Sequence, residues 1–472
     1  MTAAMLVPLL PLLLPSGMAV VLAVVIAFRR RHGLSAALAL AGLGAGLVAI
    51  PLTARVEPRR ITALLLLDGW ALLLLALVLG ATIVVTVLAH GYLSRRDGRR
   101  EELDVLLVLA AVGAGVLVAS THAASFFLGL ELLSVSLYAL LAYDRASPRG
   151  LEAGLKYLVL AASSAAFLLL GLAFLYAQTG TMELGALARV LSAPGLDPLV
   201  LAGLVLALVG IGFKLAVVPF HLWTPDVYEG APAPVTAFLA TVSKGAVLAL
   251  LLRWFVDVQA GSFRIVVSTV AIASMLVGNL LAVRQENVKR LLAYSSIAHL
   301  GYLLVAFLAG GRFAGAAVGY YLAAYFATTL AAFGVVGALS GGEREADALA
   351  DYRGLAWRRP GLAAVLTIAL LSLAGIPLTA GFVGKFYVLA AGAGADLWAA
   401  LLVLVVGSAV GLYYYLSVIV VLFAHGEAPA EPSAAAATSV VLALLLAAIL
   451  WLGFFPARLA GIVASAASSM GR

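Results

Sequence analysis

The chain has 472 residues, of which 64% are hydrophobic and 11% are charged, and its formal net charge is +7. An ordinary soluble domain has about 25% charged residues, so this composition excludes a water-soluble globule and indicates a protein that lies in lipid. The absence of cysteine excludes disulfides and iron–sulfur ligation, and the six histidines show no zinc-ligand spacing.

Apolar runs of about 20 residues recur along the chain, each long enough to cross a hydrocarbon core of about 30 Å as a helix. They are too long and too uniform for barrel strands, and an open sheet would leave backbone groups unpaired in lipid. The predicted fold is therefore an all-α polytopic membrane protein, and the first run shows no cleavage site and is expected to be retained. About 14 transmembrane helices are expected, at residues 4–28, 34–53, 64–90, 104–120, 123–143, 153–178, 199–218, 233–252, 265–283, 289–309, 313–339, 360–392, 397–424 and 436–456.

The basic residues in the loops predict how these helices are oriented. The loops on one side hold 16 of the 29 Arg and Lys residues, whereas the loops on the other side and the C-terminus hold nine. By the positive-inside rule the first set is cytoplasmic, which places both termini in the periplasm of a bacterial inner-membrane protein. This distribution accounts for the net charge, so no nucleic-acid partner is expected.

The four remaining basic residues are all lysines inside predicted spans, namely Lys156, Lys214, Lys244 and Lys385. The chain has only five lysines, and the fifth, Lys289, falls in a predicted cytoplasmic loop. Arginine keeps its proton, whereas burial can pull the pKa of a lysine toward neutrality. Lysine is therefore sorted into the membrane, and this sorting predicts residues that load and release protons.

Glu131 is the only acid that we place well inside a span. A charge near the bilayer centre costs at least about 2.5 to 3.5 kcal/mol, so a partner or a role is expected. An ion pair with Lys214 on a nearby helix would tune how readily that lysine ionises. A static pair that holds two helices together is the alternative, although buried pairs are poor stabilisers.

Two of the lysines lie beside prolines within their spans. Lys214 is five residues before Pro219, and Lys385 is eight residues after Pro377. Proline removes a backbone hydrogen bond and clashes with the preceding turn, so both helices should be broken there. Broken helices at matching places indicate the functional site of a repeat-built transporter, although single prolines often cause only packing kinks. His221 follows the first break, where a role in proton uptake competes with a structural one.

Sequence spacing predicts an internal repeat. Glu131 and Lys214 are 83 residues apart, and His299 and Lys385 are 86 residues apart. Placing Glu131 opposite His299 and Lys214 opposite Lys385 aligns spans 4 to 8 with spans 9 to 13. Because five is odd, the two units must run in opposite directions through the membrane. The predicted parts of this single membrane domain are N-terminal helices at 1–103, repeat one at 104–252, repeat two at 265–424, and the last helix with the C-terminus at 436–472.

The other polar residues within the spans differ in depth. Lys244 lies mid-span in the segment TVSKG, where reaching either interface is hard, which favours a proton relay. Lys156 lies near the start of its span, four residues after Glu152, so a surface ion pair is nearly as plausible as a functional role. His299 titrates near neutral pH and could relay protons, or it could be simply hydrogen-bonded. The tyrosines at 413–415 are interpreted as packing or interface residues.

Three stretches carry a resemblance to the antiporter-like subunit family of bacterial respiratory complex I, and it extends over essentially the whole chain. The most specific is FKLAVVPFHLWTPDVYEGAPAP at residues 213–234, which resembles the subunit N branch more than subunits L and M or the multisubunit Na⁺/H⁺ antiporters. SSIAHLGY at 295–302 and LSLAGIPLTAGFVGKFY at 371–387 support it. Subunit M has glutamate where this chain has Lys385, and subunit L has a long C-terminal lateral helix.

The resemblance implies a proton-translocating membrane-arm subunit of NADH:quinone oxidoreductase, driven by quinone reduction elsewhere in the complex. It implies no redox centre, metal or other cofactor in this chain, and it implies partners that include subunit M and the small subunits K and J. The glutamate and lysines of the family match Glu131, Lys156, Lys214, Lys244 and Lys385.

We expect protons to enter near the first broken helix, load Lys214 and Lys244, cross by way of His299 and water, and leave from Lys385. A subunit of a self-driven Na⁺/H⁺ antiporter is the first alternative. A structural spacer in a membrane hydrogenase or another respiratory assembly is the second.

Overall fold

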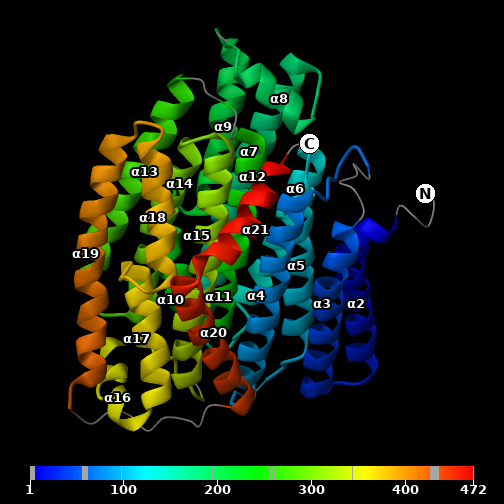
Figure 1. Ribbon diagram of the computed structural model, residues 1–472. Coiled ribbons are helices and arrows are strands. Elements are labelled where there is room, and N and C mark those ends of the chain that lie inside the picture. The colour runs from blue at the N-terminus through cyan, green and yellow to red at the C-terminus, as the bar shows by residue number, and fades with distance from the viewer. Residues whose placement is uncertain are drawn as a thin grey trace.

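The computed structural model describes residues 6–55, 62–96, 98–193, 195–255, 258, 261–342, 344–425 and 435–470. Over these ranges the chain is a helical bundle without β-strands (Figure 1). Thirteen of the described helices are long and apolar enough to cross a membrane. Residues 4 and 5 of the first predicted span and the last two residues of the chain lie outside the described residues.

The membrane-crossing helices follow one another along the chain, and short helices lie between them. The long ones are α2 (Leu10–Phe28), α3 (His32–Ala54), α4 (Gly69–Leu93), α5 (Glu102–Ala119), α6 (Ala123–Leu141), α7 (Pro148–Thr179), α9 (Pro198–Leu215), the continuous run of α11 (Ala233–Phe238), a π turn (Leu239–Ser243) and α12 (Lys244–Phe255), α13 (Gly261–Ala282), α14 (Val288–Leu308), α15 (Gly311–Leu339), α19 (Trp398–Phe423) and α20 (Ala436–Phe454). The short ones are η1 (Val7–Leu9), α8 (Leu184–Leu191), α10 (Trp223–Gly230), η3 (Leu349–Tyr352), α16 (Leu355–Arg358), α17 (Pro360–Ala374), α18 (Ala380–Ala393) and α21 (Pro456–Ser468).

The predicted fold class is confirmed, including a broken helix in each half. The predicted span at 360–392 consists of α17 and α18, which together form a fourteenth crossing of the described bundle. The other broken helix consists of α9 and α10. A proline lies within each break, where it cannot donate a backbone hydrogen bond.

The two breaks begin in the same way, with a left-handed residue that ends the first half-helix. Ala216 has a φ of 59° and Gly375 a φ of 86°. In both breaks the next amide donates to the carbonyl five residues back, at 3.1 Å and 3.0 Å, as in a Schellman cap. Glycine adopts this conformation freely, whereas alanine does so at a cost of about 1 kcal/mol.

Two isolated β-bridges reveal the inverted repeat. His122 pairs with Glu183 and Asn287 pairs with Ala348. In each bridge the residue after the first partner donates to the residue before the second, at 2.8 Å and 2.7 Å. The first bridge is followed directly by α8, and the second by η3 and α16, which lie at opposite ends of the bundle (Figure 1). The two units therefore run in opposite directions.

The register of the repeat differs from the one that sequence spacing predicts. Both bridges are related by an offset of 165 residues, which places Glu131 opposite Ser296 rather than opposite His299. Lys214 lies before its break and Lys385 after its own, so these lysines are not equivalent either. The predicted register is wrong because the connecting segments of the two units differ in length. The exact unit boundaries stay a prediction.

Three spans form the centre of the bundle and carry most of the candidate site. The spans Ala233–Phe255 and Phe313–Leu339 are buried throughout, and Val288–Leu308 is 94% buried. By contrast α2, α19 and α20 are at least two-thirds exposed and form parts of the outer surface. The start of α2 and the end of α21 lie toward the end of the bundle that carries α8 (Figure 1).

Candidate functional site

Lys214 lies in the last turn of α9, one residue before the helix ends. Its side chain is buried, and Nζ donates a hydrogen bond of 2.6 Å to Oγ of Ser134 on α6. Nζ also lies 5.3 Å from the ring centre of Tyr157 on α7, within the range of a cation–π contact. The lysine thus connects the break of α9 to two neighbouring helices.

Glu131 makes no ion pair with Lys214 in the described part of the chain, so the predicted direct pair is wrong. Ser134, one turn further along α6, takes the lysine Nζ instead. Glu131 is still close enough to act on Lys214 through space. Its Oε1 is buried without a hydrogen-bond partner among the described residues, so this oxygen remains able to accept a proton.

Lys244 follows the π turn at Leu239–Ser243, a type of irregularity that often occurs at functional sites. Its side chain is 1% exposed, and Nζ donates to Oγ of Ser296 on α14 at 2.8 Å. Tyr325 on α15 donates to the same Ser296 oxygen at 2.7 Å. The ring of Tyr228 lies 5.2 Å from Nζ. A single serine hydroxyl therefore joins three central spans.

His299 lies between two tyrosine hydroxyls on different helices. Its Nδ1 is 2.7 Å from the hydroxyl of Tyr321 on α15, and its Nε2 is 3.2 Å from that of Tyr415 on α19. The Tyr415 hydroxyl also forms a 2.5 Å hydrogen bond with Oγ of Ser295. A neutral imidazole donates from one nitrogen and accepts at the other, and each hydroxyl can do either. The cluster can therefore transmit a proton in both directions.

Lys385 lies in α18 and reaches back across the break that precedes this helix. Its Nζ donates to the carbonyl of Ala374, the last residue of α17, at 2.8 Å. The ring of Tyr302 lies 5.2 Å from Nζ. An added Cβ at Gly375 would lie 2.8 Å from the lysine Cδ, so the glycine leaves room for this side chain.

These groups lie near mid-membrane depth. Lys244 and His299 are each 11 residues from the start of their spans at Ala233 and Val288. At 1.5 Å per residue this is about 16 Å, or half of the hydrocarbon thickness. The arrangement is thus a set of buried titratable groups, each bonded to a hydroxyl or a carbonyl, in the plane where charge costs most.

Lys156 and His221 differ from this set. The Lys156 side chain is 41% exposed, and Nζ binds Glu152 at 2.6 Å and Asp226 at 2.8 Å, so the surface pair is what the structure shows. His221 is buried after the first break, and its Nδ1 has no hydrogen-bond partner among the described residues. A cavity of about 150 Å³ beside Lys156 is lined by Arg149, Glu152, Ala153, Lys156, Asp226, Glu229 and Gly230.

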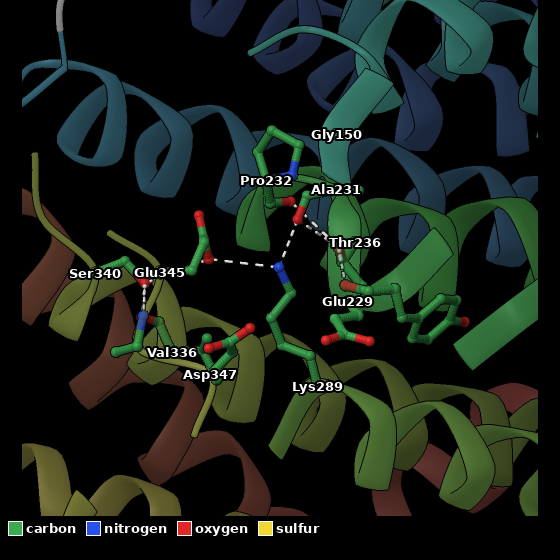
Figure 2. Close-up of polar contacts among 12 residues, drawn as sticks. Gly150, Glu229, Ala231, Pro232, Thr236, Lys289, Val336, Ser340, Glu345 and Asp347 are labelled. Atoms are coloured by element: carbon green, nitrogen blue, oxygen red, sulfur yellow. Dashed lines mark hydrogen bonds and ion pairs between the residues drawn. The ribbon is translucent and has the colours of Figure 1, made fainter. Parts of the chain in front are cut away.

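Lys289 is the lysine that the sequence misplaces. It lies in the first turn of α14 rather than in a loop, and its side chain is fully buried. Nζ donates to the carbonyl of Ala231 at 2.6 Å and lies 3.4 Å from Oε2 of Glu345 (Figure 2). Lys289 therefore replaces Lys156 among the four buried lysines.

Sequence reasoning also missed the hydroxyl partners of the site. Among the residues interpreted as packing, Tyr413 is indeed exposed, but Tyr415 is buried against His299. Tyr321 and Tyr325 are four residues apart in an apolar run, a spacing that places them on one face of a helix and could have indicated their shared role. Among the described residues there is no group of His, Asp and Glu that could hold a metal ion.

Comparisons with known proteins agree on one family. Residues 120–411 match the family model described as NADH:quinone oxidoreductase/Mrp antiporter, TM. A curated relative, NADH-quinone oxidoreductase subunit N from Ectopseudomonas mendocina (strain ymp), is 49% identical over 99% of this chain and 97% of its own length. A chain of respiratory complex I from Thermus thermophilus with bound aureothin is 35% identical, with a TM-score of 0.84 over 96% of this chain and 99% of its own. A chain of the Mrp complex from Dietzia sp. DQ12-45-1b, 23% identical, shares the fold with a TM-score of 0.85 over 100% and 98% of the two chains.

Proposed function

Because this chain belongs to the subunit N branch of the NADH:quinone oxidoreductase/Mrp antiporter family, we propose that its buried lysines and histidine carry protons through the membrane arm of the oxidoreductase. The chain is a proton-translocating membrane subunit, and quinone reduction elsewhere in the complex drives the transfer. Its part in the enzyme is translocation, with no redox centre or cofactor of its own.

The observation that carries this proposal is the chemistry of the partners. Lys244 and His299 are buried, and each binds hydroxyls rather than carboxylates. A hydroxyl can accept one proton and release another, so it passes charge without holding it. A static ion pair would instead fix the charge of both partners, which is the arrangement of Arg253 with Asp68 at 2.7 Å near the end of α12.

The proposed route begins at the cytoplasmic end, near the first broken helix. Lys214 and Lys244 are loaded in turn, His299 passes the proton on, and Lys385 releases it toward the periplasm. Glu131 acts on Lys214 through space, which supports a tuning role. Lys385 likewise lies close enough to act on His299. Two other residues, Lys156 beside its charged cavity and His221 behind the break, are assigned to uptake from the cytoplasm.

The setting of the chain is also proposed. We place the α16 end in the cytoplasm and both termini in the periplasm, because the predicted cytoplasmic loops hold most of the basic residues. The partners would be the membrane-arm subunits M, K and J. The functional units would be 104–252 and 265–424, flanked by the N-terminal helices and the last helix.

Substitution of Lys385 tests the proposal. Lys385→Met keeps the apolar stem and removes the charge, so the reconstituted complex should assemble but lose proton translocation. The measurement is the ratio of protons translocated to NADH oxidised in vesicles, with assembly checked on native gels. The matched control is Phe386→Met on the same helix, because Phe386 is 59% exposed on the outer surface. A wild-type ratio in Lys385→Met would contradict the exit assignment.

A self-driven Na⁺/H⁺ antiporter is the second candidate, because the fold is shared with a chain of an Mrp complex. Cation exchange in vesicles that contain neither NADH nor quinone would support it. If substitutions at Glu131 and Lys214 lowered stability but left pumping unchanged, the spacer alternative would be favoured instead.

A further inference from the structure

Lys289 is a buried lysine that the proposed route does not use. Its side chain is fully buried, and Nζ contacts the Ala231 carbonyl and the Glu345 carboxylate, as Figure 2 shows. We propose that Glu345 and Lys289 form a second proton-uptake site at the cytoplasmic end, which feeds Lys244 along α14. This inference rests on the proposed function and adds residues to it.

Glu345 connects the buried lysine to water. Its side chain is 19% exposed, whereas that of Lys289 is not exposed at all. Oε1 accepts from Arg96 at 3.0 Å and from the Tyr92 hydroxyl, and Oε2 accepts from Ser340 at 3.3 Å. The carboxylate is thus held in place while part of it still reaches the aqueous side.

The transfer from Glu345 to Lys289 balances without any other reactant. The carboxylate takes a proton from water and passes it to the lone pair of neutral Lys289, which becomes an ammonium beside a carboxylate again. The loaded state is stabilised by this ion pair and by the Ala231 carbonyl. In the unloaded state the carboxylate keeps its bond to Arg96.

The onward path to Lys244 follows one face of α14. Lys289 and Ser296 are seven residues apart, which is two turns on the same side of the helix and about 10 Å along its axis. Ser296 accepts from Lys244. Beside this face the Ala231 carbonyl also accepts from Thr236 on α11 at 3.5 Å. Two or three hydrogen-bonded steps of about 3 Å would span the gap.

The competing role for Lys289 is a static clamp, because Ala231 is the C-terminal cap of α10. Clamping at this position is already done by arginine. Arg290, the next residue, binds Asp226 and Glu229 of α10 at 2.8 Å each. A clamp needs no group that releases its proton, whereas a loading site does, and only lysine of the two can release it. The choice of lysine at 289 beside arginine at 290 therefore favours loading.

The decisive experiment exchanges the two adjacent residue types in the whole complex. Lys289→Arg keeps the charge and a donor but cannot release its proton, so the protons translocated per NADH should fall to less than about half of the wild-type value. Arg290→Lys is the matched control, and it should keep the wild-type ratio. Native gels report whether both complexes assemble. Equal, wild-type ratios in both variants would show that Lys289 is a clamp.

Glu345→Gln keeps the proposal testable if the larger arginine does not fit at 289. The amide has the size of the carboxylate but cannot take a proton from water, so the ratio should fall as in Lys289→Arg. An assembled Glu345→Gln complex with a wild-type ratio would overturn the second uptake site. If Lys385→Met stops pumping while both of these variants pump fully, only this inference fails. If Lys385→Met pumps normally, the proposed function itself fails.

Discussion

At the scale of single residues, the two hydroxyls on His299 give the sharpest test of the relay. Tyr415→Phe removes the hydrogen bond to Nε2 and the link to Ser295 but keeps the ring. Because a positioned proton donor or acceptor contributes about 10² to 10⁴ in rate, proton translocation should slow at least about tenfold. The measurement is the initial rate of proton uptake into vesicles, together with the rate of NADH oxidation.

The control for this variant is the neighbouring tyrosine. Tyr414 is equally buried, but its hydroxyl donates to Oδ1 of Asn279 at 3.1 Å and does not contact His299. Tyr414→Phe should therefore leave the rate close to that of the wild type. Equal rates in the two variants would show that the Tyr415 hydroxyl only packs.

The residues of the site could be predicted from the sequence only in part. A lysine in an apolar run stands out because burial of its charge is costly, which is why Lys214, Lys244 and Lys385 were identified. Ser134 and Tyr415 could not be identified, because an ordinary hydroxyl gains its role only when helices far apart in sequence pack together. Lys289 was misplaced because it lies close to a polar loop, two residues after the helix cap.

A capping signal could have corrected that last assignment. The Asn287 side chain accepts from the amide of Arg290 at 3.0 Å, so α14 begins at Val288. Asparagine followed by an apolar run is a typical helix start. The boundary of the predicted span was therefore one residue late, which was enough to leave Lys289 in the loop.

At the scale of elements, the breaks were predictable but their register was not. Proline cannot continue a helix, so Pro219 and Pro377 were sufficient to indicate where the chain bends. Sequence spacing then equated Lys214 with Lys385, although one lies before its break and the other after it. Loops of unequal length shift residues along a repeat, and only the backbone hydrogen bonds at the bridges fix the correspondence.

The second break supplies a prediction about its glycine. Gly375→Ala puts a Cβ at a φ of 86° and 2.8 Å from Cδ of Lys385, so it should cost about 1 kcal/mol and displace the lysine from the Ala374 carbonyl. Protons translocated per NADH should fall, and thermal inactivation should occur at a lower temperature.

Gly361→Ala is the control for this change. Gly361 lies in the first turn of α17, and an added Cβ there would meet nothing within 4 Å. Because alanine is the better helix former, this variant should be as stable as the wild type or slightly more stable. If both alanine variants pumped alike, the shape of the break would not matter for Lys385.

At the scale of the whole molecule, composition alone was sufficient for the fold class. A chain with 64% hydrophobic residues in runs of membrane length has few options besides a helical bundle. Burial then distinguishes the central spans from the lipid-facing ones, which uniform hydrophobicity cannot do. The span Phe313–Leu339, for example, is as apolar as its neighbours but buried throughout.

The orientation of the bundle can be tested because the natural chain has no cysteine. Ala146→Cys and Ser192→Cys place single thiols at exposed residues, the first in the connection from α6 to α7 and the second at the end of α8. An impermeant thiol reagent should label the first from the cytoplasmic side and the second from the periplasmic side, because the positive-inside rule places the α8 end outside. Leu128→Cys, which is 65% exposed on the apolar surface of α6, should stay unlabelled from both sides. The opposite labelling pattern would invert the bundle, and Glu345 and Lys289 would then open to the periplasm and could not take up protons from the cytoplasm.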